Sequence, residues 1–202
     1  MKQVTISVII LLSYIFFSGC KTTTQTPPQQ VVVGAERTDS YLPFLENRNV
    51  GLVVNQTSVI DSVHLIDYLF NKGVSIKGIY APEHGYKGNV ERGEHVDGTT
   101  DPDTGIPVHS LYGQYRKPAP QMLEGIDVMI FDMQDVGVRF FTYINTMTRV
   151  MEASAENGIK VIVLDRPNPL GYYVDGPVLK PGFESGVGLF PIPVIHGMTV
   201  GE

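Results

Sequence analysis

The amino-acid sequence predicts an α/β domain in which a parallel β-sheet carries helices on both of its faces. Two observations support this fold class. Apolar runs of strand length, bounded by turn formers, alternate with segments whose apolar residues recur at helical spacing. The runs are apolar almost throughout, as in strands that are covered on both faces. With 202 residues, of which 43% are hydrophobic, the chain is long enough for one such core.

The expected strands are rich in branched apolar residues and cover residues 50–55, 74–80, 128–132 and 160–165. Between the first two strands, Val63, Ile66 and Leu69 recur at helical spacing, which predicts a helix that ends at Lys72-Gly73 with a glycine cap. Between the last two strands, a second helix is expected over residues 143–155, before Asn157-Gly158. This alternation is the pattern of β-α-β units in a parallel sheet.

Residues 1–20 are typical of a lipoprotein signal peptide. After Lys2, the apolar run over residues 6–17 is too short to cross a bilayer core of ~30 Å as a helix. Ser18 and Gly19 then precede Cys20, the single cysteine of the chain, as in a bacterial lipobox, where the cysteine is acylated. The alternative is an ordinary signal peptide that happens to contain Cys20. No other cysteine remains for a disulfide or a thiolate site.

The rest of the chain divides into a flexible polar tether over residues 21–35 and a domain over residues 36–202. We therefore expect a lipid-anchored protein of the bacterial cell envelope. Lys21 is not an acidic retention signal, which favours the periplasm-facing side of the outer membrane. At the other end, Thr199 and Glu202 form a capping-box pattern that opens a helix, so we expect the chain to be the N-terminal part of a longer protein. The net charge of -6 and the lack of a basic run argue against a nucleic-acid partner.

Polar side chains follow every one of the expected strands. These strand ends are Asn55-Gln56-Thr57, Pro82-Glu83-His84, Asp132-Met133-Gln134-Asp135 and Asp165-Arg166-Pro167-Asn168. Because ligands of open α/β sheets bind outside the carboxyl ends of the strands, this pattern predicts a ligand site there. A glycine-rich phosphate loop does not follow the first strand, so no nucleotide or other cofactor is expected.

The sharpest catalytic candidate is Glu83 in the stretch Pro82-Glu83-His84-Gly85. A carboxylic acid beside an apolar strand end can hold a proton for donation to a leaving oxygen, and His84 can orient it or bind substrate. An ordinary exposed loop is the alternative. The Glu-His pair recurs at Glu94 and His95, but adjacent residues seldom bind one ion together and no zinc motif is present. No metal site is therefore expected.

Further candidates retain two interpretations each. Asn55 and Gln56 can bind neutral ligand groups or cap the following helix, while Tyr112, with Arg116 and Lys117 nearby, suits a sugar face and an anionic group or a plain surface loop. Asp132 can be catalytic or structural, and Asp135 can pair with Arg139 to fix its loop. The long insertion over residues 88–107, with Glu94, His95 and Asp103, is expected to be a binding loop or a disordered one.

Several motifs along the chain together resemble the NamZ-type exo-β-N-acetylmuramidases, bacterial enzymes formerly described as a domain of unknown function. The motifs, in order, are GLVVNQTSV, APEHGYKG, TGIPVHSLYG, RKPAPQML, DVMIFDMQDVGVRFFTYI, VLDRPNPLGYY and PIPVIHGMTVGE. Any one of them is weak evidence, but seven in one order are highly specific. The resemblance covers the region from about residue 50 to residue 202.

The resemblance implies a Rossmann-like N-terminal domain, with a smaller C-terminal domain that is missing from this chain. It implies hydrolysis of the bond that releases N-acetylmuramic acid from the non-reducing end of peptidoglycan fragments, with muropeptides or disaccharides as partners. It makes Glu83 the favoured catalytic carboxyl. The residues that it places around the site are His84, Asn55, Gln134, Asp135, Arg166, Asn168 and His196.

Glycoside hydrolysis also needs stabilisation of an oxocarbenium-like transition state. Asp132, Asp135, Glu94 or the N-acetyl group of the substrate itself can supply it, and the sequence does not choose among them. Two other functions are compatible with the residues: a lipid-anchored muropeptide-binding protein without catalysis, and a metal-dependent hydrolase that uses Glu83, His84 and His95.

Overall fold

A six-stranded sheet organises the part of the chain that the structure, a computed structural model, describes: residues 31–88, 99–113 and 116–202. Residues 1–31 and 32–202 are separate units, and the elements below belong to the second. In spatial order, the strands of the sheet are β5 (Thr99–Thr100), β6 (Pro107–Ser110), β4 (Ser75–Ala81), β1 (Asn49–Val54), β7 (Val128–Asp132) and β8 (Lys160–Val163). All neighbouring pairs are parallel except β5 with β6, which is antiparallel.

The strand order is that of a doubly wound fold. Numbered along the chain, the parallel strands lie in the order 3-2-1-4-5, with β1 in the centre. After β6 the chain crosses to the other side of β1 and continues with β7, so the order reverses between β1 and β7. The predicted α/β fold with a mainly parallel sheet is therefore confirmed. The strand end at Asn55 lies beside the strand end at Asp132, at the switch point where such folds bind ligands.

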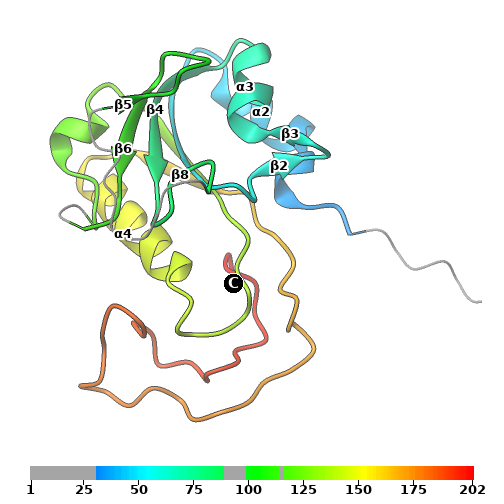
Figure 1. Cartoon of the computed structure of the whole chain (residues 1–202), viewed down its shortest axis with the longest axis vertical. Helices are drawn as coiled ribbons and strands as arrows, with labels where there is room; N and C mark the ends of the chain where they lie inside the picture. Colours follow the sequence, from blue (N-terminus) through cyan, green and yellow to red (C-terminus); the bar gives the residue numbers. More distant parts are fainter. Residues whose placement is uncertain (1–30, 89–98, 114–115) are drawn as a thin grey trace, which may run out of the picture. The chain divides into compact units, whose positions relative to one another are not determined.

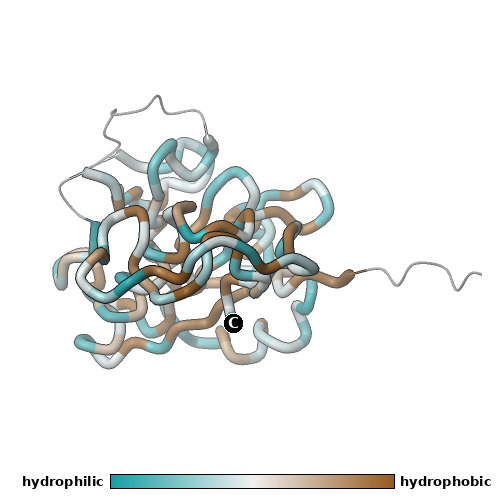
Figure 2. The backbone as a smooth tube through the Cα atoms, turned by 90° about the horizontal axis from the view of Figure 1, so that it is seen from below, coloured by the Kyte–Doolittle hydropathy of each residue, from teal (hydrophilic) through white to brown (hydrophobic). Residues whose placement is uncertain are grey.

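Helices cover both faces of the sheet. Val50, Leu52 and Val54 of β1 point to one face, where they join the core formed by α2 (Thr38–Leu45) and α3 (Leu65–Asn71). Val53 points to the other face, and joins the core of α4 (Tyr143–Glu156). These four valine and leucine side chains are fully buried, which explains why the strand is apolar without alternation. Figure 2 shows how such apolar stretches recur along the chain between polar turns.

The helix predicted after the first strand is α3, and its ends have clear physical causes. It begins at Leu65 because Val59–Ile60 (β2) and Val63–His64 (β3) form a short antiparallel hairpin before it. It ends at Asn71; Gly73, just beyond the cap residue Lys72, takes a left-handed φ of 77°, and the Val74 N–H donates to the Leu69 carbonyl at 3.1 Å. The predicted glycine cap is thus confirmed. The α2 helix and the short 3-10 helices Gly34–Glu36 (η1) and Pro120–Leu123 (η2) were not predicted.

The chain beyond β8 has no helix or strand and runs past the carboxyl ends of the strands (Figure 1). Backbone bridges of Ile195 with Val138 and Asp175 hold it in place. The capping box predicted at the end of this segment has both of its bonds: the Thr199 N–H donates to the Glu202 carboxylate at 2.8 Å, and the Glu202 N–H donates to the Thr199 hydroxyl at 3.3 Å. Among the described residues, no helix is both long and apolar enough to cross a membrane.

Candidate functional site

Asn55, at the end of β1, closes its own turn with its side chain. Its Oδ1 accepts hydrogen bonds from the backbone N–H and the hydroxyl of Thr57 at 2.9 and 2.6 Å. Its carbonyl oxygen lies 2.9 Å from Nε2 of His64, whose Nδ1 accepts from the Ile66 N–H and so caps α3. The residue that caps α3 is therefore His64 and not Asn55. The Asn55 Nδ2 is fully buried and has no hydrogen-bond partner of good geometry in the described part of the chain.

Glu83 lines a cavity of about 380 Å³ at the carboxyl ends of β4 and β6. Leu111 and Tyr112 extend the wall from β6, and α4 and the C-terminal segment close it. The full lining comprises Pro82, Glu83, Leu111, Tyr112, Arg116, Thr142, Asn145, Thr146, Arg149, Gly186 and Val187. Glu83 is half-buried, whereas His84 is exposed and has a left-handed φ of 73°. The Glu83 cavity therefore contains a carboxyl, an aromatic ring and two guanidinium groups.

Tyr143, at the start of α4, connects Asn55 with Glu83. Burial raises the pKa of its phenol, and the negative charge of Glu83 raises that pKa further, while the Asn55 amide opposes the shift. A phenol that stays protonated remains a hydrogen-bond donor at every physiological pH. The turn after β1 and the loop after β4 thus contribute polar groups to one region around a neutral tyrosine.

Asp132 and Arg166 form a buried ion pair instead of facing a ligand. The Asp132 side chain has no solvent exposure, and its two oxygens accept from Nε and Nη2 of Arg166 at 2.6 and 3.0 Å. Nη2 also donates to the Val59 carbonyl at 3.0 Å. Of the two interpretations kept for Asp132, this geometry favours the structural one, and the guanidinium of Arg166, which was expected to bind substrate, is paired with Asp132. The pair ties β7 to the segment after β8 and to the hairpin before α3.

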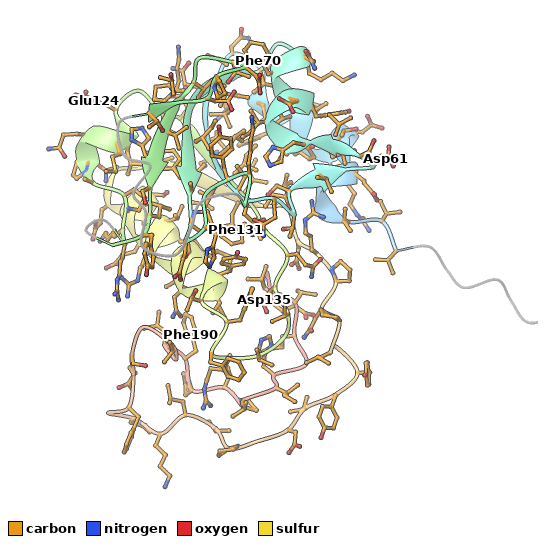
Figure 3. The ribbon with its side chains drawn as sticks, in the orientation of Figure 1. Asp61, Phe70, Glu124, Phe131, Asp135 and Phe190 are labelled. Atoms are coloured by element: carbon orange, nitrogen blue, oxygen red, sulfur yellow. The ribbon has the colours of Figure 1, made fainter. Side chains whose placement is uncertain are left out.

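Asp135 lies between the sheet and the C-terminal segment (Figure 3). It faces His196 across the next turn. Its Oδ1 accepts from the Gly137 N–H at 2.7 Å and lies 3.9 Å from Nε2 of His196. Since Nδ1 of His196 accepts from the Met198 N–H at 3.3 Å, Nε2 carries the ring proton. Burial raises the pKa of Asp135, and the Gly137 bond and His196 oppose this only in part. A carboxyl of this kind is a candidate for proton transfer.

The amide side chains of Gln134 and Asn168 support the Asp135–His196 pair. Gln134 donates through Nε2 to the carbonyls of Asp135 and Pro167 at 2.7 and 2.8 Å. Asn168 donates to the Met198 carbonyl at 2.8 Å and packs so closely over Gly137 that a Cβ there would lie 2.1 Å from its Oδ1. Both amides therefore fix the loops that carry Asp135 and His196.

The expected pairing of Asp135 with Arg139 is wrong. Arg139 instead donates through Nη1 to the carbonyls of Pro177 and Ile192 at 2.8 and 2.5 Å. A guanidinium can bind two carbonyl oxygens of an irregular segment at once, and the sequence gives no sign that the segment lies there. Arg139 thus holds the C-terminal segment while Asp135 stays free to face His196.

The remaining candidates lie at the margin of the site or outside the described residues. Gln56 is exposed and packs against Gly88, since a Cβ at Gly88 would lie 2.9 Å from its side chain. Asp103 pairs with Lys87 at 2.9 Å on the surface. Cys20, Glu94 and His95 fall outside the described ranges. Within the residues the structure describes, no three His, Cys, Asp or Glu side chains are grouped so that they could hold a metal ion.

The sequence interpretation missed the contribution of α4 to the site. Asn145 and Arg149 lie four positions apart near the start of this helix, on one of its faces, and both line the Glu83 cavity. Asn145 is buried, and its Nδ2 donates to the Gly186 carbonyl at 2.6 Å. The signal available in the sequence was an amide and an arginine, Asn145 and Arg149, four positions apart near the start of a helix that follows a polar strand end.

Comparisons with known proteins identify the family of the chain. The family model described as "Exo-beta-N-acetylmuramidase NamZ, N-terminal" matches residues 50–202. The peptidoglycan beta-N-acetylmuramidase NamZ of Bacillus subtilis (strain 168) is 47% identical over 165 residues, which cover 80% of this chain and 40% of that protein.

Two crystal structures of DUF1343 family proteins from Bacteroides fragilis NCTC 9343 match with a TM-score of 0.76 each, at 43% and 44% identity over 85% and 84% of this chain. The match covers 45% and 43% of those chains, so the present chain spans less than half the length of each of these relatives. A family match over three quarters of a chain, with the same fold, leaves no ambiguity of class: the chain belongs to the exo-β-N-acetylmuramidase NamZ family and corresponds to its N-terminal part.

Proposed function

We propose that the chain provides the catalytic half of an exo-acting β-N-acetylmuramidase, which releases N-acetylmuramic acid from the non-reducing end of peptidoglycan fragments. The observation that carries the proposal is the position of Glu83. It is a half-buried carboxyl on the wall of a sugar-sized cavity, at the strand ends where this fold class binds ligands, in a chain whose family is named for the activity. Peptidoglycan-derived disaccharides or muropeptides are the corresponding substrates.

In this mechanism Glu83 protonates the leaving glycosidic oxygen. Breaking the bond leaves positive charge on the anomeric carbon and the ring oxygen, which a second group must stabilise. Tyr112 lies in the same cavity and offers an aromatic surface for the apolar face of a sugar ring. Tyr143, whose phenol stays protonated, can donate a hydrogen bond to the substrate or to Glu83.

Fewer candidates remain for the group that stabilises the transition state than the sequence alone allowed. Asp132 is excluded because its carboxylate is buried against Arg166. Asp135, with His196 beside it, and Glu94 remain, together with the N-acetyl oxygen of the substrate. In a substrate-assisted reaction, Asp135 would orient or polarise the N-acetyl group and would not attack the sugar itself.

The test measures the release of nitrophenol from 4-nitrophenyl N-acetylmuramide by the full-length protein. Glu83→Gln should lower kcat by about a hundredfold to ten-thousandfold, the usual contribution of a general acid. Glu124→Gln is the matched control, since Glu124 is an exposed carboxylate near the amino end of β7, away from Asp135 in Figure 3. Undiminished turnover by Glu83→Gln removes Glu83 from this role.

The same assay separates the two other functions. Binding of N-acetylmuramic acid without turnover identifies a muropeptide-binding protein. Activity that disappears with a strong chelator and returns with added metal identifies a metal-dependent hydrolase.

We also propose that the protein is anchored to the bacterial cell envelope through a lipid on Cys20, on the periplasmic side of the outer membrane. The support is the lipobox-like Ser18-Gly19-Cys20 after an apolar run. Cells fed labelled palmitate should label the wild-type protein, and Cys20→Ser should remove the label and shift the protein to the soluble fraction. Ser18→Ala is the control, because it keeps the acceptor thiol. Label on the Cys20→Ser protein contradicts the anchor.

A further inference from the structure

Two arginines line the Glu83 cavity and have no assigned part in bond cleavage. Arg116 comes from the loop after β6, and Arg149 projects from α4. Among the described residues that line the cavity, one carries a carboxylate, and that residue is Glu83. The charged lining is therefore cationic on balance, and it becomes more so when Glu83 carries the proton that catalysis requires.

Neither guanidinium is used by an ion pair within the described part of the chain. The neighbouring Lys117 provides the contrast, because it pairs with Glu152 and Glu156 on α4 at 3.3 and 2.8 Å. The acidic groups of α4 that could have neutralised an arginine thus hold the lysine instead. Lys117 also fastens the Arg116 segment along α4, the helix that carries Arg149. The two arginines line one cavity, and no carboxylate in the described part of the chain forms an ion pair with either of them.

The cavity wall around Arg116 is closely packed. A Cβ at Gly186 would lie 3.3 Å from Nη1 of Arg116, so the guanidinium packs against the bare backbone there. The Gly186 carbonyl accepts from Nδ2 of Asn145, which is itself 4% exposed. That bond fixes the orientation of the amide and leaves the buried Oδ1 of Asn145 with no partner among the described residues. A buried acceptor without a partner at a cavity wall indicates a missing donor.

We infer that Arg116 and Arg149 recognise a carboxylate on the sugar, and that they make the cavity selective for an acidic N-acetylhexosamine over a neutral one. Guanidinium groups bind carboxylates through paired charge-assisted hydrogen bonds, which a hydroxyl cannot replace. The lactyl ether of N-acetylmuramic acid places such a carboxylate on the sugar ring. The Asn145 Oδ1 then accepts from a hydroxyl or amide of the same sugar. This inference rests on the proposed function and assigns specificity within it.

Equilibrium binding to the full-length chain tests the inference with two ligands that differ only in the charge: N-acetylmuramic acid and its methyl ester. The wild type should bind the acid about tenfold to a hundredfold more tightly, as expected for hydrogen bonds to a charged group. Arg116→Gln and Arg149→Gln should each reduce this preference, and the double variant should abolish it with little change for the ester. Arg149→Lys should keep part of it, because a lysine retains the charge without the paired geometry.

Arg48→Gln is the matched control, since it removes the same charge near the amino end of β1, at the other edge of the sheet, and should leave both affinities unchanged. Equal affinities of the wild type for acid and ester overturn the inference, as do arginine variants that weaken both ligands alike. Unfolding midpoints of the variants establish that they are folded.

Hydrolysis of the nitrophenyl muramide by the same preparations separates this inference from the proposed function. A wild type that prefers the acid but hydrolyses nothing leaves the inference standing and removes the catalytic function. A wild type that hydrolyses the muramide, with arginine variants whose KM for it is unchanged, removes the inference and keeps the function.

Discussion

At the scale of single residues, burial separates the carboxyl groups of the site into different functions. Asp132 has no exposure and a bidentate arginine partner, so its charge is balanced inside the fold. Asp135 is almost as buried, but its carboxylate meets only the backbone N–H groups of Val136 and Gly137 and a histidine 3.9 Å away among the described residues. Glu83 is half-buried at a cavity wall. Three carboxyls at strand ends therefore serve as a structural anchor, a candidate polarising group and a candidate acid.

Asp135 should limit the stability of the fold at neutral pH. Its folded pKa is raised above the ordinary value of 3.8, chiefly by burial, so the stability due to its protonated form is full below that pH and is lost as the pH rises through the folded pKa. Asp135→Asn, which cannot ionise, should therefore be more stable than wild type at pH 7 and gain nothing at pH 3.5, while hydrolysis falls. Urea denaturation at the two pH values measures this.

Asp61→Asn is the control for Asp135→Asn. Asp61 is exposed and has a φ of 54°, a conformation that asparagine also tolerates, so the substitution removes an equal charge without removing a buried one. A stability difference between Asp135→Asn and wild type that does not change with pH contradicts the assignment.

At the scale of elements, the turn after β7 depends on a glycine that no other residue can replace. Gly137 has a φ of 80°, and a Cβ there would lie 2.1 Å from Oδ1 of Asn168. The turn therefore needs both the left-handed conformation and the absence of a side chain. Asn168, Asp135 and His196 all lie in contact with this turn, so its geometry sets theirs.

Gly137→Ala should be destabilising and should lower hydrolysis at least tenfold. Gly158→Ala is the matched control, because Gly158 has a similar φ of 69° but open space around its Cβ position, so it should cost only the ~1–2 kcal/mol of the left-handed conformation. Thermal unfolding and the nitrophenyl assay on both variants isolate the effect of the Asn168 contact. Equal effects of the two substitutions would exclude that contact as the cause.

The elements differ in how far the sequence predicts them. β7 and α4 are long or strongly patterned, so their starts at Val128 and Tyr143 were predicted to the residue. The α2 helix was not, because residues 38–45 include Pro43 and little apolar periodicity, and its core contacts come from tertiary packing. β5 and β6 have two and four residues, too few for any periodic signal; β6 exists through its pairing with β4, and β5 through its pairing with β6.

The candidate site, like the fold, was predictable from the sequence only in part. That polar groups gather at the strand ends was predictable, since parallel strands share one carboxyl edge. Which group pairs with which was not, because Asp132 and Arg166 are 34 positions apart and become neighbours only through the sheet. Asn145 and Arg149 were not predicted as site residues for another reason. On a helix, polar residues that line a cavity recur at the same spacing as polar residues that face solvent.

At the scale of the whole molecule, the irregular segment after β8 is held over the strand ends by a few specific bonds. Arg139 supplies two of them, to the Pro177 and Ile192 carbonyls, and Asp165 accepts from the Thr199 hydroxyl at 2.5 Å. Exposed apolar side chains such as Tyr172 and Phe183 contribute little packing there, since 87% and 69% of their surface is accessible. The segment therefore has fewer stabilising contacts than the sheet.

Arg139→Met should loosen this segment and leave the sheet intact. Amide hydrogen exchange over residues 175–195 should accelerate about tenfold, since hydrogen bonds from a charged group are lost, while β1 and β4 stay protected. Lys180→Met removes a cation from the same segment, at an exposed position, and should change neither region. Faster exchange throughout the sheet would mean that Arg139 supports the whole fold and not the segment alone.

The Asp132–Arg166 ion pair also constrains how the gene can change over time. Loss of one member leaves an isolated buried charge and costs about 3–5 kcal/mol, a large part of the stability of an ordinary domain, whereas replacement of both by apolar residues can be neutral. Selection then removes either single substitution before the second can arise. The two positions are expected to stay fixed or to change together across descendants of this sequence, as a correlated pair that records the adjacency of β7 and the segment after β8.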